Sequence, residues 1–393
     1  MNLFVCAGEA SGDQHAALVI RELLQRAPTT TVWGIGSVHL HHVGVRLMYD
    51  SSRWGAMGFV QAIPKIPGLL RAFQRTQRAL LAERPDALLL VDYGAFNGRL
   101  ARWAKLHDLA VLYYCPPKSW RREAENVGGL ISASEVIATP FPWSAELLNA
   151  AGGQAVFVGH PVLELLRPRD DRAALRQEFG VHDDEQLIAI LPGSRPFELQ
   201  ALLSRLLSAA ALLRQGRKVR FALSLAPNLP EQFLHKRRAW LTTLEVATVR
   251  GRTTDLLTAC DFAWVASGTA TLEAACLGAP MVIVYDALWL SRLEGLVRRG
   301  RIGMIGMPNV IAGHFIVPEL LGPDLTAARL VELTARVLDD SALRAETVAA
   351  LAAVKDSLGT AGASARTAEL LLNLMCRTSP EQLPHGTLEP ASA

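Results

Sequence analysis

Short apolar runs alternate with longer helical patterns along almost the whole chain, and this alternation is what most limits the folds open to it. Strands that are apolar at nearly every position are buried on both faces, as in parallel sheets covered by crossover helices. The pattern therefore predicts an α/β protein built from two Rossmann-like, doubly wound domains. The expected strands are Leu3–Ala7, Thr31–Ile35, Ala87–Val91, Val111–Tyr114, Val136–Ala138, Ala155–Val158, Leu187–Leu191, Arg220–Leu225, Glu245–Val249, Phe262–Ala266 and Met281–Tyr285, and the helical patterns include Asp13–Gln25, Ile66–Leu81 and Ala327–Met375.

The chain of 393 residues exceeds what one core usually supports, since single cores stop growing beyond roughly 250–300 residues. A charged stretch with two prolines, from Pro161 to Asp171, separates the two series of strands and marks the crossover. We expect a first domain over residues 1–163 and a second over residues 164–345. Residues 346–375 should be helical, and their last helix is a candidate to pack back on the first domain. Residues 376–393 have no apolar period and are expected to be a disordered tail.

The composition argues against several classes of protein. Lys and Arg number 40 and Asp and Glu 37, so the charge gives no support for nucleic-acid binding. The 5 cysteines are odd in number and form no Cys-x-x-Cys pair, which disfavours a disulfide framework and a zinc site. The run His39, His41 and His42 has no matched ligands around it, and a solvated helix or loop is expected there. We expect a reducing, cytoplasmic location.

Two segments bear on membrane insertion. The N-terminus lacks the basic start and long apolar core of a signal peptide. The stretch Phe262–Tyr285 carries only Glu273 as a charge, which makes it the best candidate for a span. Gly268, Gly278 and Pro280 interrupt it, so we expect a strand, a loop, a helix and a strand inside a buried core instead.

Two loops of the first domain follow apolar strands at the edge where open α/β sheets bind ligands. The first strand runs into the loop Gly8–Asp13, whose small residues allow a tight turn but do not form a dinucleotide fingerprint. A plain glycine turn, with Ser11 or Asp13 capping the next helix, is an equally good interpretation of this loop. Asp92 follows Leu88–Val91, where a carboxylate is positioned to accept a proton from an alcohol or, alternatively, to cap a turn.

Two loops of the second domain have the features of a phosphate site. Leu191–Arg195 presents an arginine after a Pro-Gly turn, and a guanidinium there can bind a diphosphate through several donors. Ser267 and Gly268 precede a helix expected to start near Thr269, whose free N–H groups would meet a phosphate. Glu273 lies one turn into that helix, where it either reaches ribose hydroxyls or interacts favourably with the helix dipole.

Two lobes with such loops suggest a cleft enzyme of the GT-B glycosyltransferase type, and seven short motifs in order make the suggestion specific. These motifs are Ala7–Asp13, Met57–Val60, Asp92 with Phe96–Asn97, Val158–Pro161, Leu191–Arg195 with Glu198, Ser267–Ala270 with Leu272–Glu273, and Pro308–Gly313. On these motifs the chain resembles the lipid-A-disaccharide synthase family, inverting glycosyltransferases of family 19, from residue 1 to about residue 320.

The resemblance implies transfer of 2,3-diacylglucosamine from UDP-2,3-diacylglucosamine to 2,3-diacylglucosamine 1-phosphate, giving the beta-1,6 lipid A disaccharide 1-phosphate and UDP. It implies that Asp92 is the catalytic acid/base and Arg195 the essential arginine. The implied donor-side residues are Gly193, Ser194, Arg195, Ser267, Gly268, Thr269, Ala270, Glu273 and Asn309. The implied acceptor-side residues are Gly8, Glu9, Ser11, Gly12, Asp13, Met57, Gly58 and Asn97. Arginine and a helix start would stabilise the departing UDP, and no acidic pair lies at a strand end, so we expect neither a metal nor a cofactor.

Several positions depart from the family pattern. Ala95 stands where a second acid is common, Asp286 where an arginine is common, and Gly322 where a glutamine is usual. Residues 118–123, from Lys118 to Glu123, keep one tryptophan and reverse a charge. These changes leave a different acyl or sugar preference open. They also keep open two rivals, namely another GT-B enzyme, such as a UDP-sugar epimerase or a transferase with a different acceptor, and an idle nucleotide-sugar-binding protein.

Two segments mix apolar and basic residues. Phe59–Phe73, followed by Arg75 and Arg78, suits either a membrane-surface or acyl-binding element or an ordinary packed helix. Leu288–Arg301 has a similar mixture. With no uninterrupted span, the expectation is peripheral attachment to the cytoplasmic face of the inner membrane, and the oligomeric state stays open.

Overall fold

The computed structural model describes residues 1–52, 54, 66–117, 119, 127–166, 171–226, 229, 232–235, 237–286 and 303–376. The chain divides into two compact units. Unit 1 contains Met1–Glu164 and the C-terminal segment from Leu358, and unit 2 contains Leu165–Ser357. Each unit is a parallel sheet with helices, which confirms the predicted fold class.

Unit 1 is built on a parallel sheet whose strands lie in the order β3-β2-β1-β4-β5-β6-β7. The strands β1, β4, β5 and β6 are buried at almost every position, as expected for a sheet covered on both faces. The bounds of all the strands in this sheet are β1 Asn2–Ala7, β2 Thr31–Gly36, β3 Arg46–Asp50, β4 Ala87–Val91, β5 Val111–Tyr114, β6 Val136–Thr139 and β7 Ala155–Phe157. The helices are α1 Ala10–Arg26, α2 Val38–His42, α4 Ile66–Glu83, α5 Gly94–Lys105, α6 Gly128–Ile131, α7 Pro142–Ala150, α8 Val162–Leu165 and α19 Ala363–Met375.

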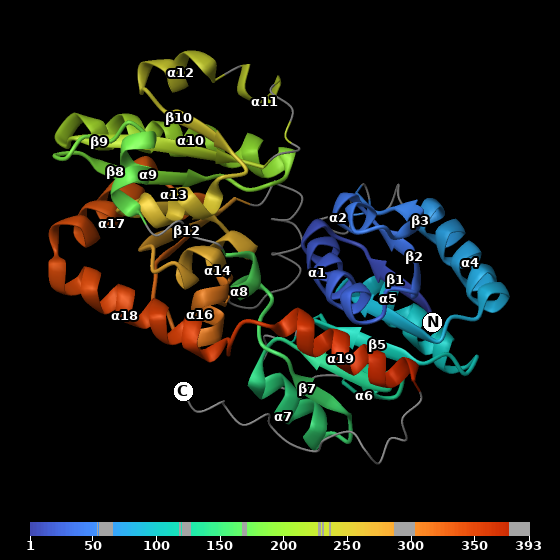
Figure 1. The fold of residues 1–393 in the computed structure, drawn as a ribbon. Helices are drawn as coiled ribbons and strands as arrows, with labels where there is room; N and C mark the ends of the chain where they lie inside the picture. The colour runs from blue at the N-terminus through green and yellow to red at the C-terminus, as the bar shows by residue number, and fades with distance from the viewer. Residues whose placement is uncertain are drawn as a thin grey trace. The chain divides into compact units, whose positions relative to one another are not determined.

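The C-terminal helix α19 returns to unit 1 and packs beside α1 against β4 and β5 (Figure 1). Arg366 fixes its start, since its Nε donates to the Val158 carbonyl at 2.8 Å. The Ser364 N–H also donates to Glu164 Oε1 at 2.8 Å. The return begins at Leu358 rather than after residue 345, because the preceding helix α18 packs on helices of unit 2.

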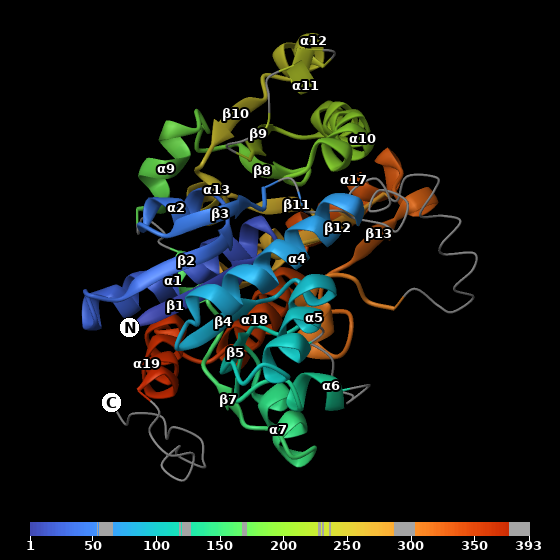
Figure 2. The same ribbon diagram turned by 90° about the vertical axis from the view of Figure 1, so that its right-hand side faces the viewer.

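Unit 2 repeats the same plan with a parallel sheet in the order β10-β9-β8-β11-β12-β13 (Figure 2). The strands are β8 Gln186–Leu191, β9 Val219–Leu225, β10 Ala247–Arg250, β11 Phe262–Ala266, β12 Met281–Tyr285 and β13 Glu319–Leu321. The helices are α9 Arg172–Glu178, α10 Pro196–Gly216, α11 Gln232–His235, α12 Arg238–Thr243, α13 Thr253–Ala259, α14 Thr269–Cys276, α16 Met307–Ala312, α17 Ala327–Asp339 and α18 Ser341–Ser357, with a 3-10 turn η2 at Gly322–Asp324.

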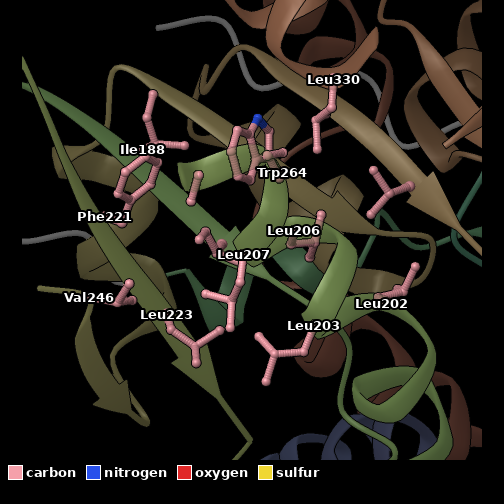
Figure 3. Close-up of a cluster of buried hydrophobic side chains, with 14 of the residues drawn as sticks. Ile188, Leu202, Leu203, Leu206, Leu207, Phe221, Leu223, Val246, Trp264 and Leu330 are labelled. Carbon is pink, nitrogen blue, oxygen red and sulfur yellow. The ribbon is translucent and has the colours of Figure 1, made fainter. Parts of the chain in front are cut away.

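The core of unit 2 forms where α10 lies on the sheet. Leu202, Leu203, Leu206 and Leu207 recur at helical spacing and are buried against a cluster that includes Trp264 (Figure 3). Within the described residues, α10 is the one helix that is long and apolar enough to cross a membrane by length and composition. Its burial in this cluster is that of a core helix.

The two strands that the sequence did not predict, β3 and β13, are both at sheet edges. β3 is only partly buried, and β13 has three residues, so neither has the continuous apolar run that identified the others. Phe262–Tyr285 forms β11, α14 and β12, which confirms that this stretch is folded core.

Candidate active site

In each unit the predicted loops lie at the point where the strand order reverses. In unit 1, β1 and β4 are neighbours, with Ala7 opposite Val91, so the loops starting at Gly8 and Asp92 leave the sheet side by side. In unit 2, β8 and β11 are neighbours, so the loops after Leu191 and Ala266 do the same. Open α/β sheets bind ligands outside the carboxyl ends of the strands at this reversal.

Asp92 is held in a constrained backbone turn at the end of β4. Asp92 and Tyr93 both have left-handed backbones, with φ values of 47° and 49°. Each such residue costs roughly 1–3 kcal/mol unless its surroundings enforce it, and such strain clusters at functional sites. Here the Asp92 N–H donates to the Tyr114 carbonyl at 3.0 Å, and the Tyr113 hydroxyl donates to the Asp92 carbonyl at 2.8 Å. These bonds fix the Asp92 backbone at the end of β4.

Asn97 braces the same turn from inside the protein. Its side chain is fully buried on α5, and its Nδ2 donates to the carbonyls of Cys6, Val91 and Asp92 at 3.2, 3.0 and 3.0 Å. These bonds join the ends of β1 and β4. Asn97, predicted on the acceptor side, thus holds the two loops of unit 1 together.

The loop after β1 lies against this turn. A Cβ at Gly8 would be 2.2 Å from the Tyr93 ring, so only glycine fits there. Burial raises the pKa of Asp92 to about 6, with a further contribution from the nearby negative charge of Glu9. A carboxylate with this pKa suits a general base near neutral pH.

His15, on α1, is a poorer base than Asp92. Burial lowers its pKa to about 4, so the surroundings disfavour a proton there.

Asp13 lies in the first turn of α1, and its side chain is engaged in the fold. It is fully buried, and its carboxylate accepts the N–H groups of Ser37 and His39 at 2.6 and 2.9 Å, at the start of α2. Both carboxylate oxygens therefore support the fold, as the capping interpretation suggested, although the helix they cap is α2. Gly12 is also buried, whereas Ser11 is partly accessible.

In unit 2, the loop Gly193–Arg195 is organised by Glu198, a residue that the list of predicted contacts did not include. Glu198 Oε2 accepts the N–H groups of Ser194 and Arg195 at 3.0 and 3.2 Å, and Oε1 lies 3.3 Å from Arg195 Nη1. Gly193 has φ 102°, and a Cβ there would lie 2.2 Å from Glu198 Oε2. The buried carboxylate thus fixes the loop backbone and contacts the Arg195 guanidinium, while Ser194 is exposed.

The helix α14 begins at Thr269 as predicted, directly after Ser267 and Gly268. Gly268 and Thr269 are exposed and Ala270 is partly so. The first N–H groups of a helix have no acceptors within it and attract anions. Glu273 lies one turn further on, and burial raises its pKa.

Asn309 is fully buried and its side-chain amide is completely occupied. Its Nδ2 donates to the Val317 carbonyl and Glu319 Oε1 at 2.9 and 2.8 Å, and its Oδ1 accepts the N–H groups of Ile316 and Val317. The side-chain amide has no donor or acceptor left over, and nucleotide binding at Asn309 stays a prediction. Asn309 supports the loop around it.

Two of the departures from the family pattern contact one arginine of α10. Arg205 Nη2 lies 3.1 Å from Asp286 Oδ2, and its Nη1 donates to the Gly322 carbonyl at 2.8 Å. Asp286 and Gly322 are therefore linked to each other through Arg205 in this chain.

Ala95 is exposed in the first turn of α5. Met57, Gly58, Lys118 and residues 120–123 lie outside the described residues. In the described ranges, no three His, Cys, Asp or Glu side chains form a group that could hold a metal ion.

Two Rossmann-like sheets, each with ligand-type loops at its reversal point, place the chain in the GT-B fold class. Solved structures agree on the fold. MurG from Acinetobacter baumannii matches with a TM-score of 0.57 and 16% identity over 95% of this chain and 99% of that one. UDP-GlcNAc 2-epimerase from Neisseria meningitidis, bound to UDP-GlcNAc, matches with a TM-score of 0.53 and 14% identity over 96% of this chain and 100% of that one.

Sequence comparison decides the family. Residues 3–369 match the model of the lipid-A-disaccharide synthetase family. Lipid-A-disaccharide synthase from Geobacter sulfurreducens is 36% identical over 374 residues, which cover 95% of this chain and 97% of the relative. The chain belongs to the lipid-A-disaccharide synthetase family, and it is a glycosyltransferase of lipid A biosynthesis. The likeness to epimerases concerns the fold alone.

Proposed function

We propose that this protein transfers 2,3-diacylglucosamine from UDP-2,3-diacylglucosamine to the 6-hydroxyl of 2,3-diacylglucosamine 1-phosphate, releasing UDP. The observation that carries the proposal is the Asp92 turn at the end of β4, where the buried Asn97 amide holds the Asp92 backbone carbonyl and the Asp92 carboxylate has a raised pKa. Family membership supplies the class of reaction, and the geometry supports the chemical roles that we propose for these residues.

In the proposed step, Asp92 accepts the proton of the acceptor hydroxyl as that oxygen bonds to the anomeric carbon of the donor. The bond between this carbon and the diphosphate oxygen breaks at the same time, and both its electrons leave with UDP. Attack from the face opposite the leaving group inverts the anomeric centre.

The departing UDP carries negative charge, which unit 2 is suited to stabilise. Arg195 provides a guanidinium that can bond two oxygens at once, and the start of α14 provides backbone N–H groups. Glu273, one turn into α14, is the candidate to accept the ribose hydroxyls.

The test is a reaction of the purified protein with both proposed substrates, followed by mass spectrometry. We expect a product with the mass of the disaccharide 1-phosphate, and UDP in equal amount. UDP-sugar conversion without the acceptor would favour the epimerase alternative. UDP binding without any turnover would favour the idle binding protein.

We further propose that the protein acts at the cytoplasmic face of the inner membrane, attached through α4. The outer face of α4 exposes Leu70 and Leu81, at 50% and 44%, beside the exposed Arg71, Arg75 and Arg78. A helix of this kind can place apolar side chains among acyl chains and arginines against anionic headgroups. Its inward face is packed at Ala72, Thr76 and Leu80, so the packed-helix interpretation also holds for that face.

Vesicle sedimentation tests this attachment. Wild-type protein should pellet with vesicles that contain anionic lipid and should be released by high salt. Leu70→Asp should weaken binding, whereas Leu106→Asp, at a leucine that is 82% exposed elsewhere in unit 1, should not. Equal binding by both variants would exclude α4 as the attachment site.

A further inference from the structure

A partly buried carboxylate of unit 2 outside the predicted site is bonded to the segment beside the start of α14. Glu319 opens β13, and its Oε2 accepts the Ile305 N–H at 3.0 Å. Its Oε1 accepts the Gly306 N–H at 2.9 Å and Asn309 Nδ2 at 2.8 Å. Three donors on one carboxylate fix the backbone of this segment, because charge-assisted hydrogen bonds are short and strong.

The same segment contacts Ser267. The Ile305 carbonyl accepts the Ser267 hydroxyl at 3.1 Å, so a single residue is bonded to Glu319 through its N–H and to Ser267 through its carbonyl. The Ser267 N–H is bonded in turn to the Val284 carbonyl at 3.1 Å. Glu319 is therefore two hydrogen bonds away from the residue that precedes Gly268 and α14.

The segment has little freedom to adjust. A Cβ at Gly306 would lie 2.1 Å from Ile283 Cδ1 and 3.1 Å from Glu319 Oε1, so the backbone is pressed against β12 and β13. If the carboxylate bonds were lost, the segment would move away from the sheet, and the Ile305 carbonyl would move with it.

We propose that Glu319 is a positioning residue for the nucleoside diphosphate, acting through Ile305 and Ser267 to hold the start of α14 in its anion-binding geometry. The inference rests on the proposed binding of UDP by unit 2. It assigns to Glu319 no contact with the ligand.

The direction in which Glu319→Gln changes UDP affinity distinguishes a positioning role from a simple charge effect. A carboxylate near a diphosphate repels it, so a Glu319 that acted only through its charge would give tighter UDP binding when changed to Gln. As a positioning residue it should give the opposite result. Gln keeps one acceptor oxygen but turns an NH2 group toward an N–H, which breaks the bond to Ile305.

The experiment is calorimetric titration of UDP into the wild type, Glu319→Gln, Ser267→Ala and the double variant. We expect Glu319→Gln to weaken UDP binding about tenfold, as for the loss of one charge-assisted bond. Both substitutions break the same chain of hydrogen bonds. The UDP affinity of the double variant should therefore be close to that of whichever single variant binds UDP more weakly. Glu346→Gln, at an exposed glutamate on α18, is the matched control and should leave binding unchanged.

Three outcomes would overturn the inference: unchanged binding by Glu319→Gln, tighter binding, or full additivity with Ser267→Ala. Melting curves identify a variant that fails to fold. If Glu319→Gln does not fold, Glu319→Asp is used instead. It keeps the charge but shortens the side chain, and we again expect weaker UDP binding. Absence of UDP binding by the wild type would count against the proposed function instead, so the two failures are distinguishable.

Discussion

The two reversal points have the same topology and different local chemistry. In unit 1, Asp92 lies in a strained turn, and its burial together with the neighbouring Glu9 raises its pKa to about 6. In unit 2, the buried Glu198 accepts the N–H groups of the arginine loop, while Gly268 and Thr269 are exposed at the start of α14. One arrangement makes a carboxylate basic, and the other presents donors to an anion. Similar sheets can therefore divide proton transfer and leaving-group binding between them.

The largest expected effect comes from removing the base. Asp92→Asn should lower turnover by roughly 10²–10⁴, the usual contribution of a general base. Asn is the appropriate substitute because it tolerates the left-handed backbone at this position. Turnover is measured as disaccharide formation, with melting curves as the control for folding. Near-normal turnover would disprove the assignment, and Glu9 would become the next candidate.

Loss of the guanidinium should have a somewhat smaller effect. Arg195→Ala should lower turnover by about 10²–10³, as when one donor to a developing anion is removed. Arg195→Lys should recover part of this rate, because a lysine keeps the charge but not the paired donors. If lysine gave no recovery and the fold were intact, charge stabilisation would not be the function of Arg195.

The dependence of kcat/KM on pH tests the role of Asp92 in unit 1. Asp92 must be deprotonated to act as a base, so kcat/KM should fall about tenfold per pH unit below about 6 and level off above it. Glu9→Gln removes a negative charge that raises this pKa, so the acid limb should shift to lower pH by less than about one unit. A shift to higher pH, or none, would contradict the proximity of the two carboxylates.

The smallest expected effect is that of a chelator. Arg195 and the α14 start provide positive charge and dipole for the diphosphate, so turnover in EDTA should stay within about twofold of the untreated value. Loss of turnover that magnesium restores would show that unit 2 needs a cation.

Much of the fold was predictable because buried parallel strands are apolar at nearly every position. β3 and β13 were missed because edge strands need no such run. Motif order selected Asp92, Arg195 and Ser267, yet the sequence could not separate ligand contacts from supporting residues. Asp13 and Asn309 have the same polar character whether they meet a ligand or backbone N–H groups, and only the folded chain shows the latter. Glu198 acts through a local capping box and belongs to a motif, whereas the bracing by Glu319 depends on tertiary hydrogen bonds that no local pattern marks.

The central claim is that proton transfer belongs to unit 1 and diphosphate binding to unit 2. UDP titration of Asp92→Asn and Arg195→Ala against the wild type tests it most directly. The account predicts that Asp92→Asn binds UDP within about twofold of the wild type, whereas Arg195→Ala binds it about tenfold or more weakly. Equal losses in the two variants, or a larger loss in Asp92→Asn, would contradict the division.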